Sequence, residues 1–328
     1  MKNIYFLAID SSSILHISGE IWIFKFANIV SNYLNPGNGP MFNCTVVAQD
    51  KFSCEISDGF EFNLNKSIVP YKQADIIISN CFLYNSIEHL TERLNNVRAS
   101  LNWLKRQYEN GAYVAAACSG SVLLAEAGLL NGKEATTSWW LEDYFRTRYP
   151  EIKLLTEHII VPHERLITAG AVTSYYNMLL SIIGKFGSRN LAQACSKFML
   201  IDINRQSQSP YSLMNPMPQF SDNLVSKAQS FICENFQKNI DMNELSDYLA
   251  VSYRTLARRF KATTGDPPTR YVQKVRIEAA KGLLETTDLN FETITERVGY
   301  SDVSTFTQLF KRITSITPVE YRRKFSMI

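Results

Sequence analysis

Short apolar runs alternate with longer amphipathic stretches up to about residue 203. The runs are typical of buried strands, whereas the stretches repeat their apolar positions at the spacing of an α-helix. The runs that we expect to form strands are 3–9, 43–49, 74–79, 113–117, 152–155, 158–161 and 165–168. The stretches that we expect to form helices are 20–34, 87–111, 118–130, 139–149, 172–186 and 188–203. This alternation predicts an α/β three-layer sandwich, in which helices cover both faces of a mostly parallel sheet.

The pattern stops at residues 204–220, "NRQSQSPYSLMNPMPQF", which contain three prolines and show no periodicity. Such a composition favours a linker. Beyond it, every amphipathic stretch has helical spacing and no run has the character of a strand. We therefore expect an α/β domain over residues 1–205, a linker over 206–218 and an all-α domain over 219–328.

The all-α part contains an internal repeat of apolar positions. Leu245, Leu249, Val251, Leu256 and Phe260 recur as Ile294, Val298, Tyr300, Phe306 and Phe310, with an offset of 49 residues for the first three and 50 for the last two. Each copy predicts a short helix, a tight turn and a second helix, which is capped by Ser252 or Asp302. The second helix buries its i, i+4 apolar pair and leaves a polar face outside. Helix–turn–helix units place that face in the major groove of DNA.

A single helix over residues 267–286 is predicted between the two copies, because prolines stand at its start and no breaker follows until Gly282. Such a helix would hold the two units at a fixed separation, and adjacent major grooves on one face of DNA lie about 34 Å apart. The alternative is a generic helical bundle with a basic surface.

Charge favours the DNA-binding interpretation. The net charge of +3 lies in residues 219–328, which carry 16 Lys and Arg against 13 Asp and Glu. Residues 251–276 hold seven basic side chains and only Asp266 against them, and residues 311–324 hold five against Glu320. Two basic clusters within a repeated helical pattern indicate nucleic acid as the partner.

Residues 220–325 resemble the two halves of the AraC/XylS DNA-binding domain, in "SYRTLARRFKATTGDPPTRYVQKVRIEAAKGLL" and "ITERVGYSDVSTFTQLFKRITSITPVEYRRKF". The resemblance implies base contacts from Arg254, Ala257 and Arg258 in the first recognition helix, and from Val303, Ser304, Thr307 and Gln308 in the second. Arginine suits guanine and glutamine suits adenine, whereas alanine and valine could contact only thymine methyl groups. Ala250 replaces the turn glycine that Gly299 supplies in the second copy, so we expect strain there.

The stretch "YVAAACSGSVLLAEAGLL" (113–130) runs from a strand through Cys118 into a helix. With residues 111–205 it resembles a class I glutamine amidotransferase-like, PfpI-type domain, as fused to AraC-type domains in GlxA-like regulators. This implies a flavodoxin/amidotransferase-like fold. In enzymes of that superfamily a histidine activates the cysteine, and related regulators commonly read ATTHW. This chain reads "ATTSWW", with Ser138 at the histidine position.

Without that histidine, catalysis lacks its base and its general acid. A cysteine thiol of ordinary pKa is mostly protonated at neutral pH. His16, His89, His158 and His163 stand elsewhere in the sequence. We therefore predict that Cys118 is not catalytic and that the chain is not an enzyme. The alternative is a cysteine-dependent hydrolase or amidase that uses Cys118 and carries a DNA-targeting domain.

The resemblance implies a sensor instead of an enzyme. Related regulators often respond to small nitrogen-containing metabolites, and we expect a ligand pocket at Cys118, Ser119, Ser138 and Trp139. Another alternative is that the domain binds no effector and only forms a homodimer, which we expect in either case. We predict no cofactor or metal, because no histidine or cysteine has metal-ligand spacing. The scattered cysteines and the absence of a membrane-length apolar run lead us to expect a cytoplasmic protein.

Overall fold

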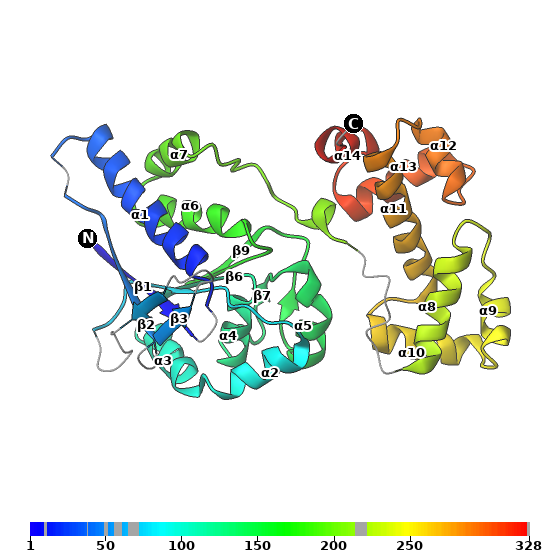
Figure 1. Cartoon of the computed structure of the whole chain (residues 1–328), viewed down its shortest axis with the longest axis horizontal. Helices are drawn as coiled ribbons and strands as arrows, with labels where there is room; N and C mark the ends of the chain where they lie inside the picture. Colours follow the sequence, from blue (N-terminus) through cyan, green and yellow to red (C-terminus); the bar gives the residue numbers. More distant parts are fainter. Residues whose placement is uncertain are drawn as a thin grey trace. The chain divides into compact units, whose positions relative to one another are not determined.

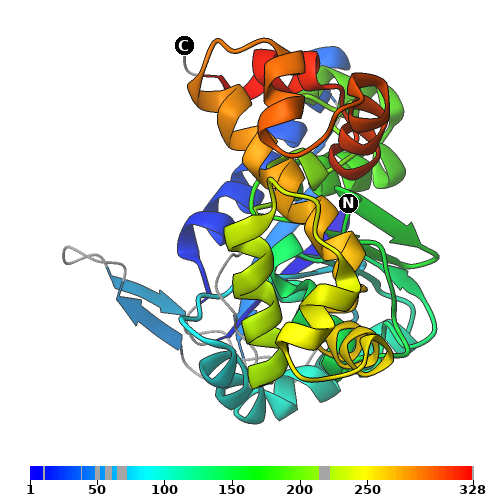
Figure 2. The same cartoon turned by 90° about the vertical axis from the view of Figure 1, so that its right-hand side faces the viewer.

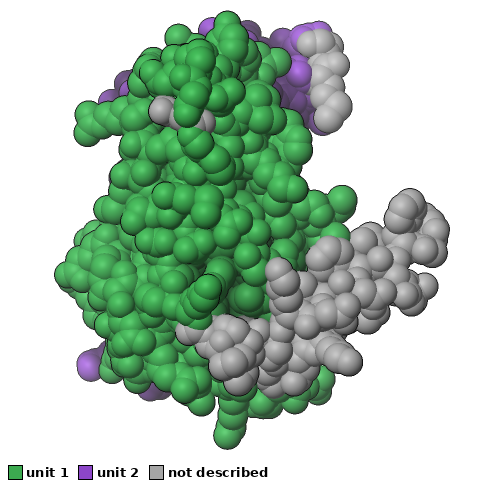
Figure 3. Space-filling view, turned by 90° about the vertical axis from the view of Figure 1, so that its left-hand side faces the viewer, with its two compact units in different colours: residues 1–208 green, residues 209–328 purple. Residues whose placement is uncertain are grey.

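A computed structural model of the chain divides into two compact units, residues 1–208 (unit 1) and 209–328 (unit 2), coloured separately in Figure 3. The structure describes residues 1–9, 12–37, 39–48, 52–55, 61–64, 72–213 and 222–326. The predicted linker over 206–218 therefore falls partly outside the described residues, from residue 214 onward.

Unit 1 is built around a six-stranded sheet with the order β2-β1-β5-β6-β10-β9 among its described strands. Those strands are β1 (Lys2–Ala8), β2 (Phe42–Ala48), β5 (Ile76–Ser79), β6 (Tyr113–Ala117), β9 (Ile160–His163) and β10 (Leu166–Ala169). Every pairing in this sheet is parallel except that of β9 with β10. Separate pairs are formed by β3 (Phe52–Glu55) with β4 (Glu61–Leu64) and by β7 (Glu134–Ala135) with β8 (Lys153–Leu154).

Helices cover both faces of this sheet (Figure 1). One face packs against α1 (Ile14–Leu34), α6 (Ser174–Phe186) and α7 (Arg189–Phe198), and the other against α2 (Ile87–Asn95), α3 (Arg98–Glu109), α4 (Gly120–Glu126) and α5 (Glu142–Arg148), which follows the 3-10 turn η1 (Trp139–Leu141). Successive strand residues point to opposite faces, so Ile4 and Phe6 enter the first core and Leu7 the second. The predicted α/β three-layer sandwich with a mostly parallel sheet is confirmed. No helix among the described residues is long and apolar enough to cross a membrane.

Several predicted helix boundaries are wrong. The helix expected over 20–34 begins earlier, at Ile14, and the helix expected over 118–130 ends at Glu126. The helix expected over 87–111 is two helices, because the chain turns at Asn96, whose N–H bonds to the Arg93 carbonyl in a tighter turn. Asparagine and the β-branched Val97 are both slightly weaker helix formers than their neighbours, which favours the break without requiring it. The helix expected over 188–203 ends at Phe198, because Leu200 adopts a left-handed conformation with φ of 54°.

Unit 2 is helical throughout its described residues. Its elements are η2 (Ser209–Tyr211), α8 (Asn223–Asn235), α9 (Met242–Tyr248), α10 (Tyr253–Thr264), α11 (Pro268–Thr286), α12 (Phe291–Arg297), α13 (Val303–Thr314) and α14 (Pro318–Phe325). The all-α prediction for this part is confirmed. Its two helix–turn–helix units are α9–α10 and α12–α13, and the helix predicted over 267–286 is α11.

Each half of unit 2 has its own small core, and α11 contributes to both. Tyr271, Val272 and Val275 of α11 pack against α8, α9 and α10, whereas its later residues Ile277 and Leu284 pack against α12, α13 and α14. Figure 2 shows α11, in orange, running from the first group of helices to the second. A helix of this length spans about 28 Å at 1.5 Å per residue.

The predicted apolar pairs of the second helices are confirmed as core residues. Leu256, Phe260, Phe306 and Phe310 are fully buried. The predicted caps are also present, since Ser252 Oγ accepts a hydrogen bond from Thr255 N at 3.3 Å and Asp302 Oδ1 accepts one from Thr305 N at 2.7 Å.

The repeat extends further along the chain than the predicted apolar positions. Tyr271 and Tyr321 lie 50 residues apart, and their rings pack edge-on against Phe260 and Phe310, with centroid distances of 5.2 and 5.5 Å. The helix that follows each recognition helix is therefore attached in the same way. Each helix–turn–helix unit of unit 2 is thereby extended by a third helix.

The two turns differ as expected in backbone strain. Ala250 has φ of 53° and Gly299 has φ of 85°, so both are left-handed, a conformation that costs a residue with a side chain about 1 kcal/mol. Ala250→Gly should therefore raise the free energy of unfolding by about 1 kcal/mol. Gly299→Ala should lower it by about 3 kcal/mol, because the added Cβ would also lie 2.5 Å from the Gln237 carbonyl oxygen.

Denaturant unfolding of the two variants beside the unaltered chain measures both effects. A lower free energy of unfolding in Ala250→Gly would show that the left-handed conformation of Ala250 is not strained.

Candidate functional site

The turn that carries Cys118 is tightly built, and we call it the elbow. Cys118 follows β6 with φ of 55°, and its N–H lies 3.1 Å from the carbonyl oxygens of both Ala169 and Gly170 at the end of β10. Two residues later, a Cβ at Gly120 would lie 2.3 Å from the Ser79 carbonyl oxygen. Only glycine lets α4 start this close to β5, so packing alone accounts for Gly120.

The Cys118 thiol lies in a buried environment that favours its ionised form. Cys118 is 4% exposed, and the neighbouring Cys81 is 7% exposed. A hydrogen bond from Cys81 lowers the pKa of Cys118, and contributions from Ser138 and Ser119 add to this, so that together they outweigh the opposing effect of burial. The pKa of Cys81 is raised in turn, first by its hydrogen bond to Cys118 and then by burial. Cys118 is therefore the thiol of this pair that ionises first.

Ser138 lies beside Cys118, at the position where the family resemblance expects histidine. Its side chain is fully buried, and Ser138 Oγ has no hydrogen bond of good geometry among the described residues. A serine hydroxyl can donate to a thiolate, but it cannot act as a base at neutral pH.

The four histidines of the chain have other partners or positions. His16 Nδ1 lies 2.7 Å from Ser13 Oγ, and His158 Nδ1 lies 3.4 Å from a Glu157 carboxylate oxygen. His89 bonds with Asn85, and His163 ends β9. None of these histidines hydrogen-bonds to Cys118 within the described part of the chain. No group of three or more possible metal ligands occurs among the described residues either.

The predicted ligand pocket is closed in this structure. Ser119 and Ser138 are fully buried, and Ser119 Oγ donates to the Phe82 carbonyl at 2.8 Å. Trp139 is half-buried, with its ring edge-on to that of Trp140. A ligand could reach Cys118 only if these side chains moved, so this pocket stays a prediction.

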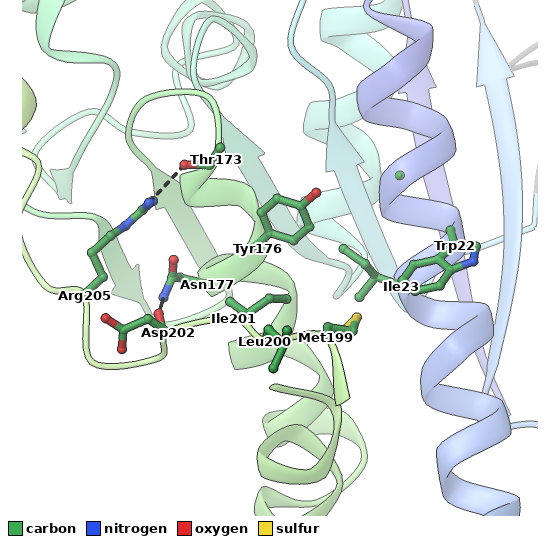
Figure 4. A pocket seen from close by; sticks show the side chains of 11 residues that line it. Trp22, Ile23, Thr173, Tyr176, Asn177, Met199, Leu200, Ile201, Asp202 and Arg205 are labelled. Carbon is green, nitrogen blue, oxygen red and sulfur yellow. Dashed lines mark hydrogen bonds between the residues drawn. The ribbon is translucent and has the colours of Figure 1, made fainter. Parts of the chain in front are cut away.

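Two open cavities lie elsewhere in unit 1. The smaller, of about 500 Å³, lies between α1, α6 and the segment after α7, and its walls include Trp22, Ile23, Tyr176 and Ile201. Figure 4 shows its polar side, where Arg205 donates to Thr173 Oγ1 at 3.0 Å and Asn177 donates to the Asp202 carbonyl at 3.0 Å. The larger cavity, of about 900 Å³, lies against β9, α6 and α7, and its walls include the basic residues Lys185, Arg189 and Arg205. Neither cavity could be predicted from the sequence, because its walls come from distant segments.

The first recognition helix, α10, presents two arginines to solvent. Arg254 and Arg258 are exposed, and neither has a hydrogen bond or ion pair with another described residue. Arg259, by contrast, pairs with Asp222 through Nε at 2.9 Å and Nη2 at 2.5 Å. Ala257 is half-buried between the two free arginines. On α10, Arg254 and Arg258 are therefore available to an outside partner, whereas Arg259 is paired within the protein.

The second recognition helix, α13, presents polar side chains in the same places. Ser304 and Gln308 are exposed, whereas Val303 and Thr307 are half-buried. Thr307 Oγ1 donates to the Val303 carbonyl at 2.7 Å, so its methyl group and the lone pairs of its hydroxyl remain for an outside partner. The two helices therefore differ in chemistry, with arginines on α10 and neutral groups on α13.

Two family models match parts of the chain. Residues 245–324 match a model described as a helix-turn-helix domain, and residues 88–185 match the DJ-1/PfpI family. HTH-type transcriptional regulator CdhR of Pseudomonas aeruginosa is 23% identical over 321 residues, which cover 98% of this chain and 91% of that protein. HTH-type transcriptional regulator GbdR of the same species is 23% identical over 329 residues, which cover 98% and 84%.

A solved structure supports the fold of unit 1. A protein from Vibrio parahaemolyticus assigned as a transcriptional regulator superposes with a TM-score of 0.52 at 18% identity, covering 60% of this chain and 98% of that one. At this identity the likeness concerns the fold alone.

The pair of thiols at the elbow gives a test by titration. Replacing Cys81 with alanine removes the hydrogen bond that lowers the pKa of Cys118, so the pKa of Cys118 should rise in Cys81→Ala. Ultraviolet absorbance of the thiolate against pH measures this. A lowered pKa of Cys118 in the folded state raises the free energy of unfolding as pH rises through that pKa. Cys81→Ala should therefore also lose this pH-dependent increase in stability.

Cys195→Ala is the matched control, because burial raises the pKa of Cys195 to about 11. Its removal should leave unchanged the first rise in thiolate absorbance, which belongs to Cys118. An unchanged first transition in Cys81→Ala would show that Cys81 does not act on Cys118.

Proposed function

We propose that this chain, which joins a DJ-1/PfpI-type α/β domain to an AraC-type helix-turn-helix domain, is a transcription regulator that binds specific DNA sequences. The observation that carries the proposal is the pair of recognition helices, each with a buried apolar side and a free polar side. The names of the full-length relatives support it. The predicted boundaries, 1–205, 206–218 and 219–328, are part of the proposal.

DNA bases are contacted, in this proposal, by residues of both recognition helices. They are Arg254, Ala257 and Arg258 of α10 and Val303, Ser304, Thr307 and Gln308 of α13. A free guanidinium can bond both guanine O6 and N7, and a free glutamine amide can bond adenine. The free state of Arg254 and Arg258 supports this assignment, because a side chain already paired within the protein would have to give up that partner first.

Unit 1, in this proposal, is a sensor that turns over no substrate. A cysteine nucleophile needs a proton acceptor, and the neighbour of Cys118 is Ser138. The lowered pKa of Cys118 favours the alternative, a cysteine-dependent hydrolase, but supplies no acid for the leaving group. The effector is a small metabolite, and its pocket involves Cys118, Ser119, Ser138 and Trp139 once the elbow opens. Release of product from activated esters or amides by the purified chain would establish the alternative.

A homodimer is the assembly that we propose, formed through unit 1. Trp22, Phe26, Ile29 and Tyr33 follow one another on α1 at intervals of four, three and four residues, and Phe198 of α7 packs edge-on against Phe26 and Tyr33. Ile29 is 64% exposed and Tyr33 is 72% exposed, although both belong to a stripe spaced for helix packing. Exposed apolar stripes of this kind mark interaction surfaces.

Removing one free arginine should weaken specific DNA binding and relax one base preference. Arg254→Ala or Arg258→Ala should cost on the order of 1–3 kcal/mol on a selected site and lose discrimination at one base pair. Arg259→Ala is the matched control, since it should lower stability through loss of the Asp222 pair and keep the base preference. Equal weakening on all sequences, with a smaller salt dependence, would show that Arg254 and Arg258 contact only phosphates.

A charge placed in the apolar stripe should separate the dimer. Ile29→Glu should give a monomer in analytical ultracentrifugation at concentrations where the unaltered chain is a dimer, because burying the carboxylate costs several kcal/mol. Leu83→Glu, at another apolar site with 66% exposure, is the control and should remain dimeric. A dimeric Ile29→Glu would place the interface elsewhere.

A further inference from the structure

Gln208 is buried inside unit 1 although it is the last residue of that unit. Its side chain is 2% exposed. Gln208 Nε2 donates to the Thr137 carbonyl at 2.8 Å and to the Thr156 carbonyl, and Gln208 Oε1 accepts from Ala171 N at 3.1 Å. Both ends of one carboxamide are therefore bound by the protein backbone.

The site around this carboxamide is shaped and polarised for it. Thr136 Oγ1 and the His158 carbonyl lie 3.4 Å from Nε2, so every group that surrounds the nitrogen can accept a hydrogen bond. A Cβ at Gly170 would lie 2.6 Å from Nε2, so glycine is needed to make room. A carboxylate here would face several acceptors, and an apolar side chain would leave them unpaired.

The backbone around Gln208 is fastened to the same part of unit 1. Gln208 N donates to the Glu157 carbonyl at 2.9 Å, and Ile159 N donates to the Gln206 carbonyl at 3.0 Å. Further back, Arg205 and Asp202 are held by α6 and the residue before it (Figure 4). We call residues 202–208 the strap.

The loop that binds Gln208 is also bonded to the elbow. Thr137, whose carbonyl accepts from Gln208, directs its hydroxyl to the Cys118 carbonyl at 3.3 Å. Ser121 Oγ lies 2.8 Å from that same hydroxyl and donates to the Cys118 carbonyl at 2.6 Å. Ser138 is the next residue of the loop. A change at Cys118 or Ser138 therefore reaches Gln208 through one residue.

After Gln208, the first residues of unit 2 are held by other residues of unit 2. Ser212 accepts a hydrogen bond through its carbonyl from Lys281 Nζ of α11, whose side chain is 3% exposed. The Tyr211 ring packs edge-on against Phe325 with a centroid distance of 5.1 Å. Gln208 directly precedes the turn η2, in which Pro210 is buried.

We propose that Gln208 is a latch, whose carboxamide binds a dedicated site beside the elbow and fixes the point where the chain leaves the sensor. When an effector moves the loop of Thr136, Thr137 and Ser138, the site loses its shape and the strap is released. Unit 1 then no longer holds the residue that directly precedes unit 2. The regulatory consequence rests on the proposed function, whereas the binding of Gln208 in its site does not.

Hydrogen exchange on the full chain tests the binding step without DNA. Gln208→Ala should raise amide exchange in residues 205–208 and 156–159 by about tenfold or more, because the strap loses its buried hydrogen bonds. Gln206→Ala is the matched control, with an exposed side chain on the same strap, and should exchange like the unaltered chain. Gln208→Glu keeps the side-chain volume and should open the strap as Gln208→Ala does. Exchange in both Gln208 variants equal to that of Gln206→Ala would overturn the latch.

Propionamide, which reproduces the end of a glutamine side chain, serves as the probe of the site. It should restore slow exchange in Gln208→Ala and have no effect on the unaltered chain, where the site is filled. Failure to restore slow exchange at millimolar propionamide would show that the site has no affinity for the carboxamide itself.

A double variant tests transmission from the elbow. Thr137→Val removes the hydroxyl bonded to Cys118 and keeps the carbonyl bonded to Gln208. As a single substitution, Thr137→Val should speed amide exchange in residues 205–213. Combined with Gln208→Ala, it should add nothing to the exchange already seen in Gln208→Ala. Additive effects would overturn transmission while leaving the latch and the DNA-binding proposal intact. Loss of DNA binding with an intact latch would instead overturn the proposed function.

Discussion

Helix α11 is the constraint on which unit 2 depends, because its residues complete two cores at once. Each helix–turn–helix unit is too small to bury its own apolar side. Phe260 is covered by Tyr271 near the start of α11, and Phe310 is covered by Tyr321, which stands at the same place in the second copy. Because α11 is continuous, the two recognition helices cannot move independently without breaking one of these cores. The spacing between the two base-reading surfaces is therefore a property of one helix.

Unit 1 keeps the geometry of a nucleophile elbow, whereas we propose that it turns over no substrate. The left-handed backbone at Cys118 and the close approach at Gly120 are backbone requirements, and they persist whatever the side chain at residue 138. Ser138 follows Thr137 in the polar loop beside the elbow, and its hydroxyl cannot act as a base at neutral pH. The same loop binds Gln208 through the Thr137 carbonyl. In our proposal, the loop beside the elbow therefore holds the last residue of unit 1.

The sequence predicted the parts of the structure that depend on local pattern. The strand of residues 113–117, the repeat, the caps Ser252 and Asp302 and the continuous α11 all follow from periodicity or from one side chain near its own backbone. The break at Asn96 and the end of α7 at Phe198 could not be predicted, because helix propensities there differ by only a few tenths of a kcal/mol. Gln208 was missed because its partners lie 37 to 72 residues away, in loops with no periodic signal.

Selection from a random library of DNA duplexes, with the full chain at near-physiological salt, tests the central claim most directly. The account predicts enrichment of a motif with two short elements about one helical turn apart, or about 34 Å. The element read by the arginines of α10 should contain guanine, and the element read by α13 should depend on shape or on adenine and thymine. Recovery of no motif, with binding that vanishes as salt rises, would contradict the account, because phosphate contacts alone would then explain the binding.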